Sequence, residues 1–385
     1  ILVDEEFRLQ IMNSYKAECR VCKSIDLEPV VSLGKVPLAN NLIDDLNQKV
    51  ETFPLELFKC NSCNNCQLSY NVDPRLMFDH YLYTSSTSKS FVEHFDNAAE
   101  KYIKEYNLNK DDLIIDIGSN DGIGLRKFKE LEFDVLGIEP AKNISEIANK
   151  NGITTINSYF NTDAIKIINE QYRKPKIILA SNVFAHSNDL LEIATSAMNL
   201  LDNDGVFIIE VQYLVDTIKD LTFDNIYHEH YNYWSVIALQ NLFNQLDYNI
   251  SNVEKIDTHG GSIRIYIEKN QMKINPSVKD YIKEETVFGI DKQDVFREFK
   301  RQIEESKINV LKNIRNIKIA SDKIAAYAAP AKASTKLNYY GISSDIIEFI
   351  VEDNPLKHNK IIPGVDIPIY DVDYLIEKDI KVVIV

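Results

Sequence analysis

The sequence predicts an α/β protein in which a doubly wound parallel sheet is joined to a small cysteine-bearing module and a second α/β unit. Three observations carry this prediction. Paired cysteines occur only near the amino end, strand-like apolar runs alternate with amphipathic segments between residues 113 and 211, and the alternation returns after residue 323. Strands that alternate with helices are typical of a parallel sheet, which binds ligands at the carboxyl ends of its strands.

The length, charge and composition of the chain limit the number of domains and the kinds of partner that it can have. The chain has 385 residues, more than one core usually holds, so two or three domains are expected. The net charge of −15 argues against a nucleic-acid partner, which would need a basic surface. No apolar run reaches the roughly 18 residues of a membrane span, and the first residues lack the pattern of a secretory signal. We therefore expect a soluble cytoplasmic protein. The fold does not require a partner and so allows a monomer, and the sequence leaves the oligomeric state open.

Two cysteine pairs precede residue 67. Cys19-x-x-Cys22 and Cys60-x-x-Cys63 each place two thiolates on one tight turn, and two such turns predict a tetrahedral zinc site. Cys66 is the spare thiol. Reduced thiols or a disulfide are the alternatives, and an intracellular setting disfavours the disulfide. Four thiolates leave zinc no open position, so we expect a structural role in folding this module.

The central feature is an apolar strand that runs into a glycine-rich turn. Residues 113–115 lead into Asp116, and Gly118 and Gly122 permit a tight turn before a helix that begins near Ile123. The spacing D-x-G-x-x-x-G is not that of a pyrophosphate-binding loop. Glu139 ends the next strand, where an acid can hold a ribose diol by two hydrogen bonds. The sequence therefore predicts a nucleoside site, with glycines required only for packing as the alternative.

The alternation continues beyond Glu139. Strands are predicted at 153–156, 176–181 and 205–211, and helices at 143–151 and 190–201. The residues that follow the strand ends should meet in one crevice. They are 118–121, 139–141, 181–186 and 210–213.

An aromatic stretch precedes this domain. Tyr81 and Tyr83 are followed by hydroxyl-bearing residues 84–88, which either line a cleft or simply cap a helix that runs from Ser88 to Tyr106.

Residues 227–231 read Tyr-His-Glu-His-Tyr. In an extended segment Tyr227, Glu229 and Tyr231 face one way, and His228 and His230 the other. A histidine beside an acid and a phenol suits acid–base chemistry. A metal site and an ordinary polar loop are the alternatives.

A second doubly wound unit is predicted near the carboxyl end. A long helix at 296–317 precedes strands that begin near residue 323 and occupy 346–351 and 380–385. Small residues at 328, 329, 331 and 333 allow a diphosphate to approach a helix start, where Lys332 could neutralise it. Close packing of helix on sheet is the alternative.

Motifs along almost the whole chain resemble the S-adenosylmethionine-dependent sugar-nucleotide C-methyltransferases. They are Cys19-Arg20-Val21-Cys22, Pro37-Leu38-Ala39-Asn40, Cys60-x-x-Cys63 with Gln67-Leu68, Tyr81-x-Tyr83-x-Ser85-Ser86, Asp116-Ile117-Gly118-Ser119-Asn120-Asp121-Gly122, Glu139-Pro140-Ala141, Asn182-Val183-Phe184-Ala185-His186, Tyr227-His228-Glu229-His230, His259-Gly260-Gly261-Ser262-Ile263-Arg264, Ala329-Pro330-Ala331-Lys332 and Asp353-Asn354-Pro355. The resemblance implies a zinc module (1–72), a class I methyltransferase domain with a Rossmann-like fold (73–270) and a Rossmann-like α/β domain that contacts the nucleotide sugar (271–385).

The resemblance also implies the roles of individual residues. The S-adenosylmethionine pocket would comprise Asp116, Gly118, Ser119, Asn120, Glu139, Ala141, Ser181 and Asn182, with Glu139 on the ribose and Asp116 and Gly118 beside the methionine. His230 would be the general base, assisted by Glu229, Tyr227 and Tyr83, with Glu229 orienting the imidazole. Substrate contacts would come from His186, Tyr81, Lys332 and Asn354, and the zinc ligands would be Cys19, Cys22, Cys60 and Cys63.

Four positions differ from the family pattern. Ser181 replaces a usual Asn, Gln212 a usual Pro, and Ala328 and Ala333 occupy positions that are often Gly. The two alanines leave the nucleoside base open. The expected activity is C-methylation of a nucleoside-diphosphate-linked keto-deoxysugar through an enolate. The alternatives are a non-catalytic sugar-nucleotide-binding homologue and an NAD-dependent sugar-nucleotide oxidoreductase, which the D-x-G-x-x-x-G spacing disfavours.

Overall fold

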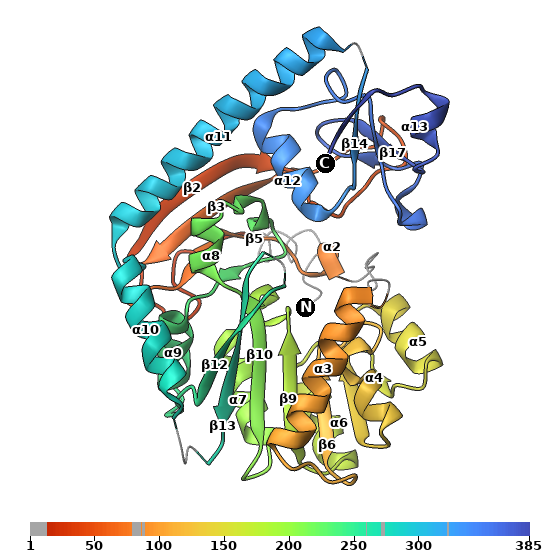
Figure 1. Cartoon of the computed structure of the whole chain (residues 1–385). Helices are drawn as coiled ribbons and strands as arrows, with labels where there is room; N and C mark the ends of the chain where they lie inside the picture. Colours follow the sequence, from red (N-terminus) through yellow and green to blue (C-terminus); the bar gives the residue numbers. More distant parts are fainter. Residues whose placement is uncertain (1–13, 79–85, 87–88, 259, 271–273, 322) are drawn as a thin grey trace, which may run out of the picture.

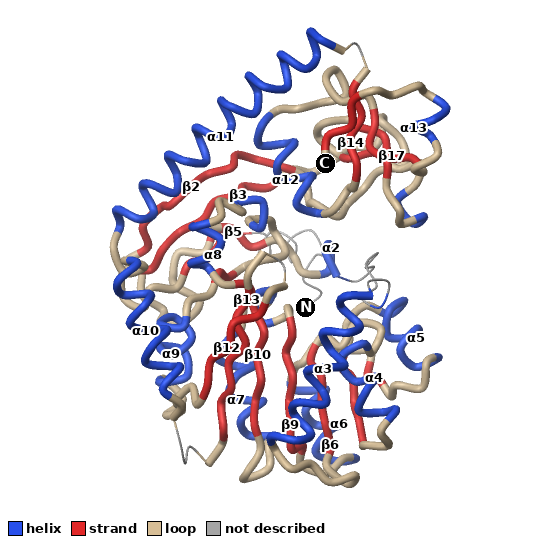
Figure 2. The backbone as a smooth tube through the Cα atoms, viewed as in Figure 1, coloured by secondary structure: helices blue, strands red, loops and turns tan. Residues whose placement is uncertain are grey.

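The computed structural model describes residues 14–78, 86, 89–258, 260–270, 274–321 and 323–385. A seven-stranded sheet, a long hairpin-based sheet and a smaller parallel sheet are the three main layers (Figure 1, Figure 2). Tyr81 and Tyr83, on which two of the predicted roles depend, lie outside the described residues.

The seven-stranded sheet forms the centre of the chain. Its strands are β6 (Leu113–Ile117), β7 (Asp134–Ile138), β8 (Thr155–Ile156), β9 (Pro175–Ser181), β10 (Val206–Gln212), β12 (Asn252–Ile256) and β13 (Ser262–Glu268). They lie in the order β12-β13-β10-β9-β6-β7-β8, and β13 is antiparallel to both of its neighbours. A doubly wound sheet closed by one reversed strand is the class I methyltransferase arrangement, as the resemblance predicts.

Helices cover both faces of this sheet because its strands are apolar on both sides. Ile114 of β6 packs with α3 (Lys89–Glu105) and α4 (Ile123–Glu130) on one face. Ile115 packs on the opposite face, which α6 (Thr162–Gln171), α7 (Leu190–Leu200) and α9 (Val236–Asn244) cover. α5 (Lys142–Lys150) follows β7 and packs with α4.

The cysteine-bearing module is built on a four-stranded antiparallel sheet. β2 (Leu27–Val36), β3 (Phe53–Cys60) and β4 (Cys66–Leu68) come from the amino-terminal part of the chain. The fourth strand, β11 (Asn232–Tyr233), comes from the far end of the methyltransferase region and pairs with β4. A short β1 (Ser14–Tyr15) pairs with β5 (Tyr70–Asn71), and α2 (Arg75–Phe78) follows.

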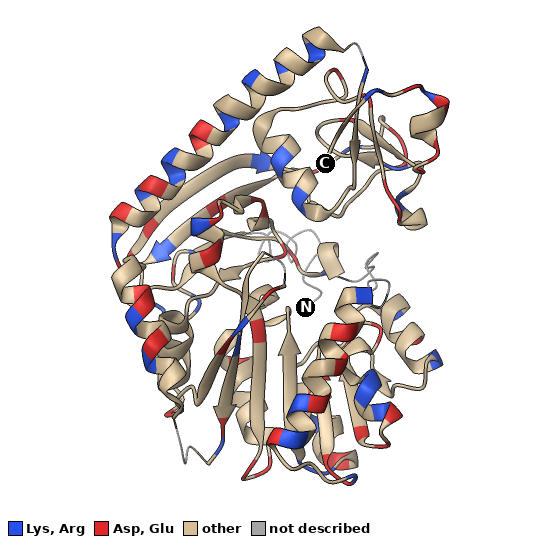
Figure 3. Cartoon of the chain, in the orientation of Figure 1, with Lys and Arg blue, Asp and Glu red and all other residues tan. Residues whose placement is uncertain are grey.

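The carboxyl-terminal part begins with α10 (Pro276–Phe288) and the long α11 (Gln293–Ala320), which runs along β2 (Figure 1). Acidic and basic residues both occur in the first half of α11, whereas only basic residues occur in its second half (Figure 3). A sheet in the order β16-β17-β15-β14-β18 follows, with α12 (Ala331–Tyr340) and α13 (Tyr374–Glu377). Its strands are β14 (Ile324–Tyr327), β15 (Phe349–Val351), β16 (Ile361–Ile362), β17 (Ile367–Tyr370) and β18 (Val382–Ile384).

Most predicted elements lie where the sequence placed them, but several differ in extent, among them the strand predicted at 346–351, which is reduced to β15. The strand predicted at 153–156 is reduced to β8, at the edge of the sheet, and the long helix begins three residues earlier than predicted. No helix in the described part of the chain combines the length and apolarity needed to cross a membrane. The domain boundaries at residues 72 and 270, and the cellular location, stay predictions.

Candidate active site and zinc site

The four cysteines of the two C-x-x-C turns converge. Their sulfur atoms all lie within 4.8 Å of one another. Cys19 and Cys63, and Cys22 and Cys60, approach to 3.5 Å between sulfurs. Four sulfurs about 2.3 Å from one zinc ion would be about 3.8 Å apart, so the cluster fits a tetrahedral site after small adjustments. Cys66 is buried but outside the cluster, which agrees with the prediction that Cys63 completes the site.

The loop after β6 is shaped by backbone contacts with β7. The N–H groups of Gly118 and Ser119 both donate to the carbonyl of Ile138, at 2.8 and 3.1 Å. Gly118 has a φ of 65°, and a Cβ there would lie 2.5 Å from the side chain of Val183. Glycine is therefore required at this position both for conformation and for space.

Glu139 closes this loop from the end of β7. One carboxylate oxygen accepts from the N–H of Asn120 at 3.0 Å, and the other accepts from the N–H of Ala141 at 2.8 Å. Burial raises the pKa of Glu139, while these two hydrogen bonds lower it. Each oxygen keeps a second lone pair, so the carboxylate can still accept from two hydroxyls of a ribose.

Asp116 and Asp121 add two more acidic side chains beside Glu139. All three carboxylates are buried, and among the described residues none forms an ion pair with a lysine or arginine. Burial, reinforced by Glu139, raises the pKa of Asp116 to about 8. Uncompensated carboxylates fit a cationic ligand such as S-adenosylmethionine, which carries a sulfonium and an ammonium group.

Two buried oxygens of the same loop have no hydrogen-bond partner among the residues that the structure describes. They are Oγ of Ser119 and Oδ1 of Asp121, although the other Asp121 oxygen accepts from the N–H of Ser86 at 3.1 Å. Orphaned buried oxygens are uncommon, and here they mark where a polar ligand would sit. On the adjoining strand, Asn182 follows Ser181 with a φ of 57° and donates its N–H to the Glu210 carbonyl. These residues fit the predicted cofactor.

His230 lies in a turn and not in an extended segment. Its N–H donates to the carbonyl of Tyr227 at 2.9 Å, and the turn brings the rings of Tyr227 and His230 to 4.1 Å between centroids. The prediction that these two side chains face opposite ways is therefore wrong. A β-turn returns its fourth residue to its first, whereas a strand alternates.

The tautomer of His230 is set by a backbone group. Nδ1 lies 2.9 Å from the carbonyl oxygen of Asn225, which can only accept, so Nδ1 carries the proton. In the neutral ring, Nε2 then holds the lone pair that a general base needs. The Asn225 carbonyl thus orients the imidazole, a task for which the sequence proposed Glu229. A carbonyl has no sequence signature, and no pattern could have revealed it.

Glu229 and His228 face the zinc module. Oε1 of Glu229 accepts from the side chain of Asn40 at 2.5 Å. His228 is buried with Nε2 3.3 Å from the Phe53 carbonyl, and burial lowers its pKa to about 4. His228 is therefore a neutral packing residue. Asn40 belongs to one of the motifs that the resemblance rests on, although no role was predicted for it.

The zinc module also holds the chain beyond the turn. Asn232 and Tyr233 form β11 on the edge of its sheet, and the hydroxyl of Tyr231 donates to the Val72 carbonyl at 2.6 Å. The N–H of Leu68 donates to the Tyr231 carbonyl at 2.9 Å. The cysteine-bearing module thus contacts both the turn at residues 227–230, which the sequence predicts to be catalytic, and the strand that follows it.

Arg20, between the two cysteines of the first pair, links the module to His186. Its buried guanidinium donates to the Leu68 carbonyl at 2.7 Å and to Oδ1 of Asn188 at 3.1 Å. Two residues earlier, His186 ends η2 (Phe184–His186) with its ring centroid 4.9 Å from that of His230. The structure therefore brings His186 next to His230, and its predicted role in binding substrate stays a prediction.

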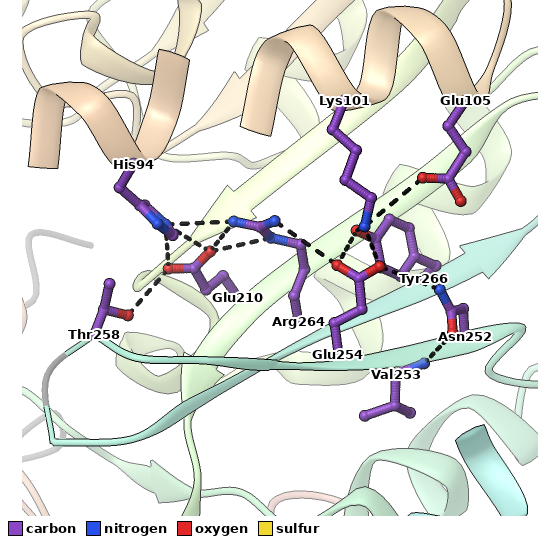
Figure 4. Close-up of polar contacts among 10 residues, drawn as sticks. All are labelled: His94, Lys101, Glu105, Glu210, Asn252, Val253, Glu254, Thr258, Arg264 and Tyr266. Atoms are coloured by element: carbon purple, nitrogen blue, oxygen red, sulfur yellow. Dashed lines mark hydrogen bonds and ion pairs between the residues drawn. The ribbon is translucent and has the colours of Figure 1, made fainter. Parts of the chain in front are cut away.

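A buried ionic network fixes α3 to the sheet (Figure 4). Glu210 of β10 accepts from His94 of α3 at 2.9 Å and from Arg264 of β13 at 2.7 Å. Burial alone would raise the pKa of Glu210, but these two partners hold it below its ordinary value. Breaking such a pair would leave a charge uncompensated, so the network is structural. Arg264 comes from a motif for which no role was predicted.

The two predicted substrate residues of the carboxyl-terminal part have different settings. Lys332 lies in the first turn of α12 and is half-buried, and none of the described acids forms an ion pair with it. Burial lowers the pKa of Lys332. The side chain of Asn354 accepts from the N–H of Leu356 at 3.0 Å and caps a short helical turn, η4 (Pro355–Lys357). Lys332 is therefore the better placed of the two to meet an anion.

Comparison with known proteins decides the family. Models of three families match in chain order: a zinc binding domain at residues 19–78, a methyltransferase domain at 91–253 and a C-methyltransferase C-terminal domain at 257–385. The C-methyltransferase NovU of Streptomyces niveus is 33% identical over 357 residues, which cover 92% of this chain and 85% of NovU. The chain belongs to this C-methyltransferase family. It is an S-adenosylmethionine-dependent C-methyltransferase with a zinc-binding module.

Solved methyltransferases align with about half of the chain. A magnesium protoporphyrin IX methyltransferase of Synechocystis PCC 6803 is 11% identical over 46% of this chain and 82% of its own, at a TM-score of 0.37. A methyltransferase of Archaeoglobus fulgidus is 15% identical over 46% of this chain and 94% of its own, at a TM-score of 0.38. The fold assignment rests on strand order and on the family models.

Proposed function

We propose that this methyltransferase methylates a carbon next to the ketone of a nucleoside-diphosphate-linked keto-deoxysugar. The observation that carries the proposal is the contact between Nδ1 of His230 and the Asn225 carbonyl. It leaves Nε2 as the proton acceptor, in a turn shared with Tyr227 and beside His186.

The chemistry follows from these groups. His230 accepts the proton from the carbon next to the ketone, and the electrons of that C–H bond move into the carbonyl to give an enolate. The phenol of Tyr227, whose ring contacts the imidazole at a tilt of 41°, is suited to donate to the enolate oxygen. Glu229 is held by the side chain of Asn40, which fixes the position of its carboxylate on the same turn.

The cofactor residues fit the same reaction. S-adenosylmethionine supplies, when bound, the methyl group that the enolate carbon takes up. Glu139 would accept from the ribose hydroxyls, and Asp116 would face the positive charge of the methionine end. Holding both substrates at one sheet edge supplies much of the rate.

The nucleotide of the substrate is assigned to the carboxyl-terminal part. Lys332 offers a half-buried ammonium group in the first turn of α12, where backbone N–H groups also favour an anion. A diphosphate has the charge to satisfy both. The identity of the base does not follow from these contacts.

The test is transfer of a labelled methyl group from S-adenosylmethionine to TDP-, UDP- and GDP-linked 4-keto-6-deoxysugars. We expect one carrier to give a product with the label on a ring carbon, and the His230→Gln variant to retain cofactor binding but lose about 10³-fold or more in turnover. Binding of sugar nucleotide without any transfer would favour the non-catalytic alternative.

A further inference from the structure

A three-residue helical turn, η3 (Phe223–Asn225), joins α12 to the catalytic turn. Its first residue is buried, with its ring centroid 5.5 Å from that of Tyr339 and 5.9 Å from that of Tyr340. Both tyrosines lie in the last turn of α12. Phe223 therefore packs η3 against the helix on which the substrate's diphosphate is proposed to bind.

The second residue of η3 pairs with the same helix. Oδ2 of Asp224 lies 3.1 Å from Nζ of Lys336, and the Asp224 side chain is only 12% exposed. Lys332 precedes Lys336 by four residues, so both amines lie on one face of α12. The charge of Asp224 also acts on Lys332 and opposes the loss of its proton. Asp224 thus faces both lysines.

The third residue of η3 holds the general base. The carbonyl of Asn225 accepts from Nδ1 of His230 at 2.9 Å, and its side-chain oxygen accepts from Gln212 at 3.2 Å. Asn225 is buried. Gln212 replaces a proline that is usual in the family, and proline could not make this contact. The three consecutive residues therefore connect α12 directly to the imidazole.

We propose that Asp224 is a positioning residue through which α12 fixes the tautomer of His230. The inference rests on the proposed function for its link to substrate, but its structural part does not. The peptide that carries the Asn225 carbonyl adjoins Asp224, so a shift of η3 by about 1 Å would break the hydrogen bond to Nδ1. Without that bond the proton is free to occupy either nitrogen, and Nε2 is no longer reserved for the substrate.

The test compares Asp224→Asn with Lys336→Met, each of which removes one charge of the pair. Lys360→Met is the matched control. Nζ of Lys360 makes a 2.7 Å ion pair with Asp44, which likewise links the carboxyl-terminal part to another part of the chain, in this case the amino-terminal one. This control pair does not involve η3. All proteins are loaded with zinc. The ring tautomer is measured with S-adenosylhomocysteine bound, and turnover is measured with S-adenosylmethionine.

Two readouts separate positioning from general stability. The first is the ¹⁵N shift of the His230 ring in histidine-labelled protein, assigned by its loss in His230→Gln. We expect a single Nδ1–H tautomer in the wild type and in Lys360→Met, and a mixture of tautomers in Asp224→Asn and Lys336→Met. The second is kcat on the keto-sugar nucleotide that the wild type turns over, expected to fall about tenfold in both variants, with affinity for S-adenosylhomocysteine within about twofold of the wild type.

The outcomes are distinct. Wild-type tautomer and kcat in a folded Asp224→Asn variant would overturn the inference. If that variant fails to fold, a wild-type tautomer and a wild-type kcat in Lys336→Met would overturn the inference. Absence of turnover by the wild type on every sugar nucleotide would count against the proposed function alone, because the ring tautomer would still decide the role of Asp224.

Discussion

The methyltransferase sheet and the carboxyl-terminal sheet share one backbone arrangement. In each, the turn that follows the first strand hydrogen-bonds to the end of the next strand. After β6, the N–H of Gly118 donates to the Ile138 carbonyl at 2.8 Å, and after β14 the N–H of Ala328 donates to the Val351 carbonyl at 2.8 Å. Both residues have positive φ, 65° for Gly118 and 71° for Ala328. Each turn therefore leaves its strand in the same conformation.

In both sheets, a glutamate directly after the second strand accepts hydrogen bonds from backbone N–H groups of this turn and of its own loop. Glu139 accepts from the N–H of Asn120, in the first turn, and from that of Ala141 two residues ahead. Glu352 accepts from the N–H of Ala329, in the equivalent turn, at 2.9 Å, and from the residue two positions ahead at 3.1 Å. The hydrogen-bond geometry alone does not distinguish the two glutamates.

Charge compensation distinguishes them. Lys357 lies 3.6 Å from Glu352 and also donates to the Ala329 carbonyl. Burial acts to raise the pKa of Glu352, but its backbone hydrogen bonds and this lysine hold it below its ordinary value, whereas the pKa of Glu139 is raised. From this comparison we infer that a glutamate after the second strand is available to a ligand where no lysine or arginine neutralises it. Glu352 is satisfied by the protein, and Glu139 is left for a ligand.

The largest contrast is expected between Glu139→Gln and Glu352→Gln. Glu139→Gln should weaken S-adenosylhomocysteine binding about 100-fold, because it removes charge-assisted hydrogen bonds to the ribose worth about 2 to 3 kcal/mol. Glu352→Gln should leave that affinity within about twofold and instead lower the melting temperature by a few degrees. Isothermal titration and thermal unfolding measure the two effects. Equal losses of affinity would show that charge compensation does not separate the sites.

The pH dependence should have opposite sign in the two regions. The raised pKa of Asp116, about 8, means that the folded state favours its neutral form, so its contribution to stability is lost as pH rises through about 8. The lowered pKa of Glu352 gives a contribution that is present at neutral pH and lost as pH falls below about 4.

The pH dependence of ligand affinity tests the ionisation of Asp116. S-adenosylhomocysteine keeps a positive ammonium group, so its affinity should rise about tenfold between pH 6.5 and 8.5 as Asp116 ionises. Titrations across this range, with Asp116→Asn as the control, should show the rise only in the wild type. A flat wild-type profile would contradict the uncompensated-acid account.

The smallest effect is expected at Ala328. An alanine at φ 71° is strained by about 1 kcal/mol, so Ala328→Gly should stabilise the carboxyl-terminal part by up to about 0.5 kcal/mol after the entropy of glycine is subtracted. Chemical denaturation gives the sign. A loss of stability would mean that the methyl group packs favourably enough to exceed the strain.

The sequence predicted the parts of the site that lie close together along the chain. The turn after β6 has a glycine signature, and the cysteine pairs have ligand spacing, so both could be read from local pattern. Glu139 followed because a second parallel strand ends at the same edge as the first.

The rest depended on groups or distances that no pattern encodes. The Asn225 carbonyl is a backbone atom, and Asn40 reaches Glu229 from the other end of the sequence. The alternation expected of an extended segment does not hold at residues 227–230, which form a turn directly before β11 pairs with the edge of the zinc module. Tertiary pairing overrode the local period there.

The most direct test of the central claim is incorporation of solvent deuterium next to the ketone of the sugar nucleotide. The experiment uses the zinc-loaded protein with S-adenosylhomocysteine bound, so that proton removal is observed without methyl transfer. The account predicts deuterium at the carbon that is methylated in the full reaction, with exchange about 10³-fold slower in His230→Gln at unchanged affinity for S-adenosylhomocysteine. Exchange at the wild-type rate in His230→Gln would contradict the assignment of His230 as the base.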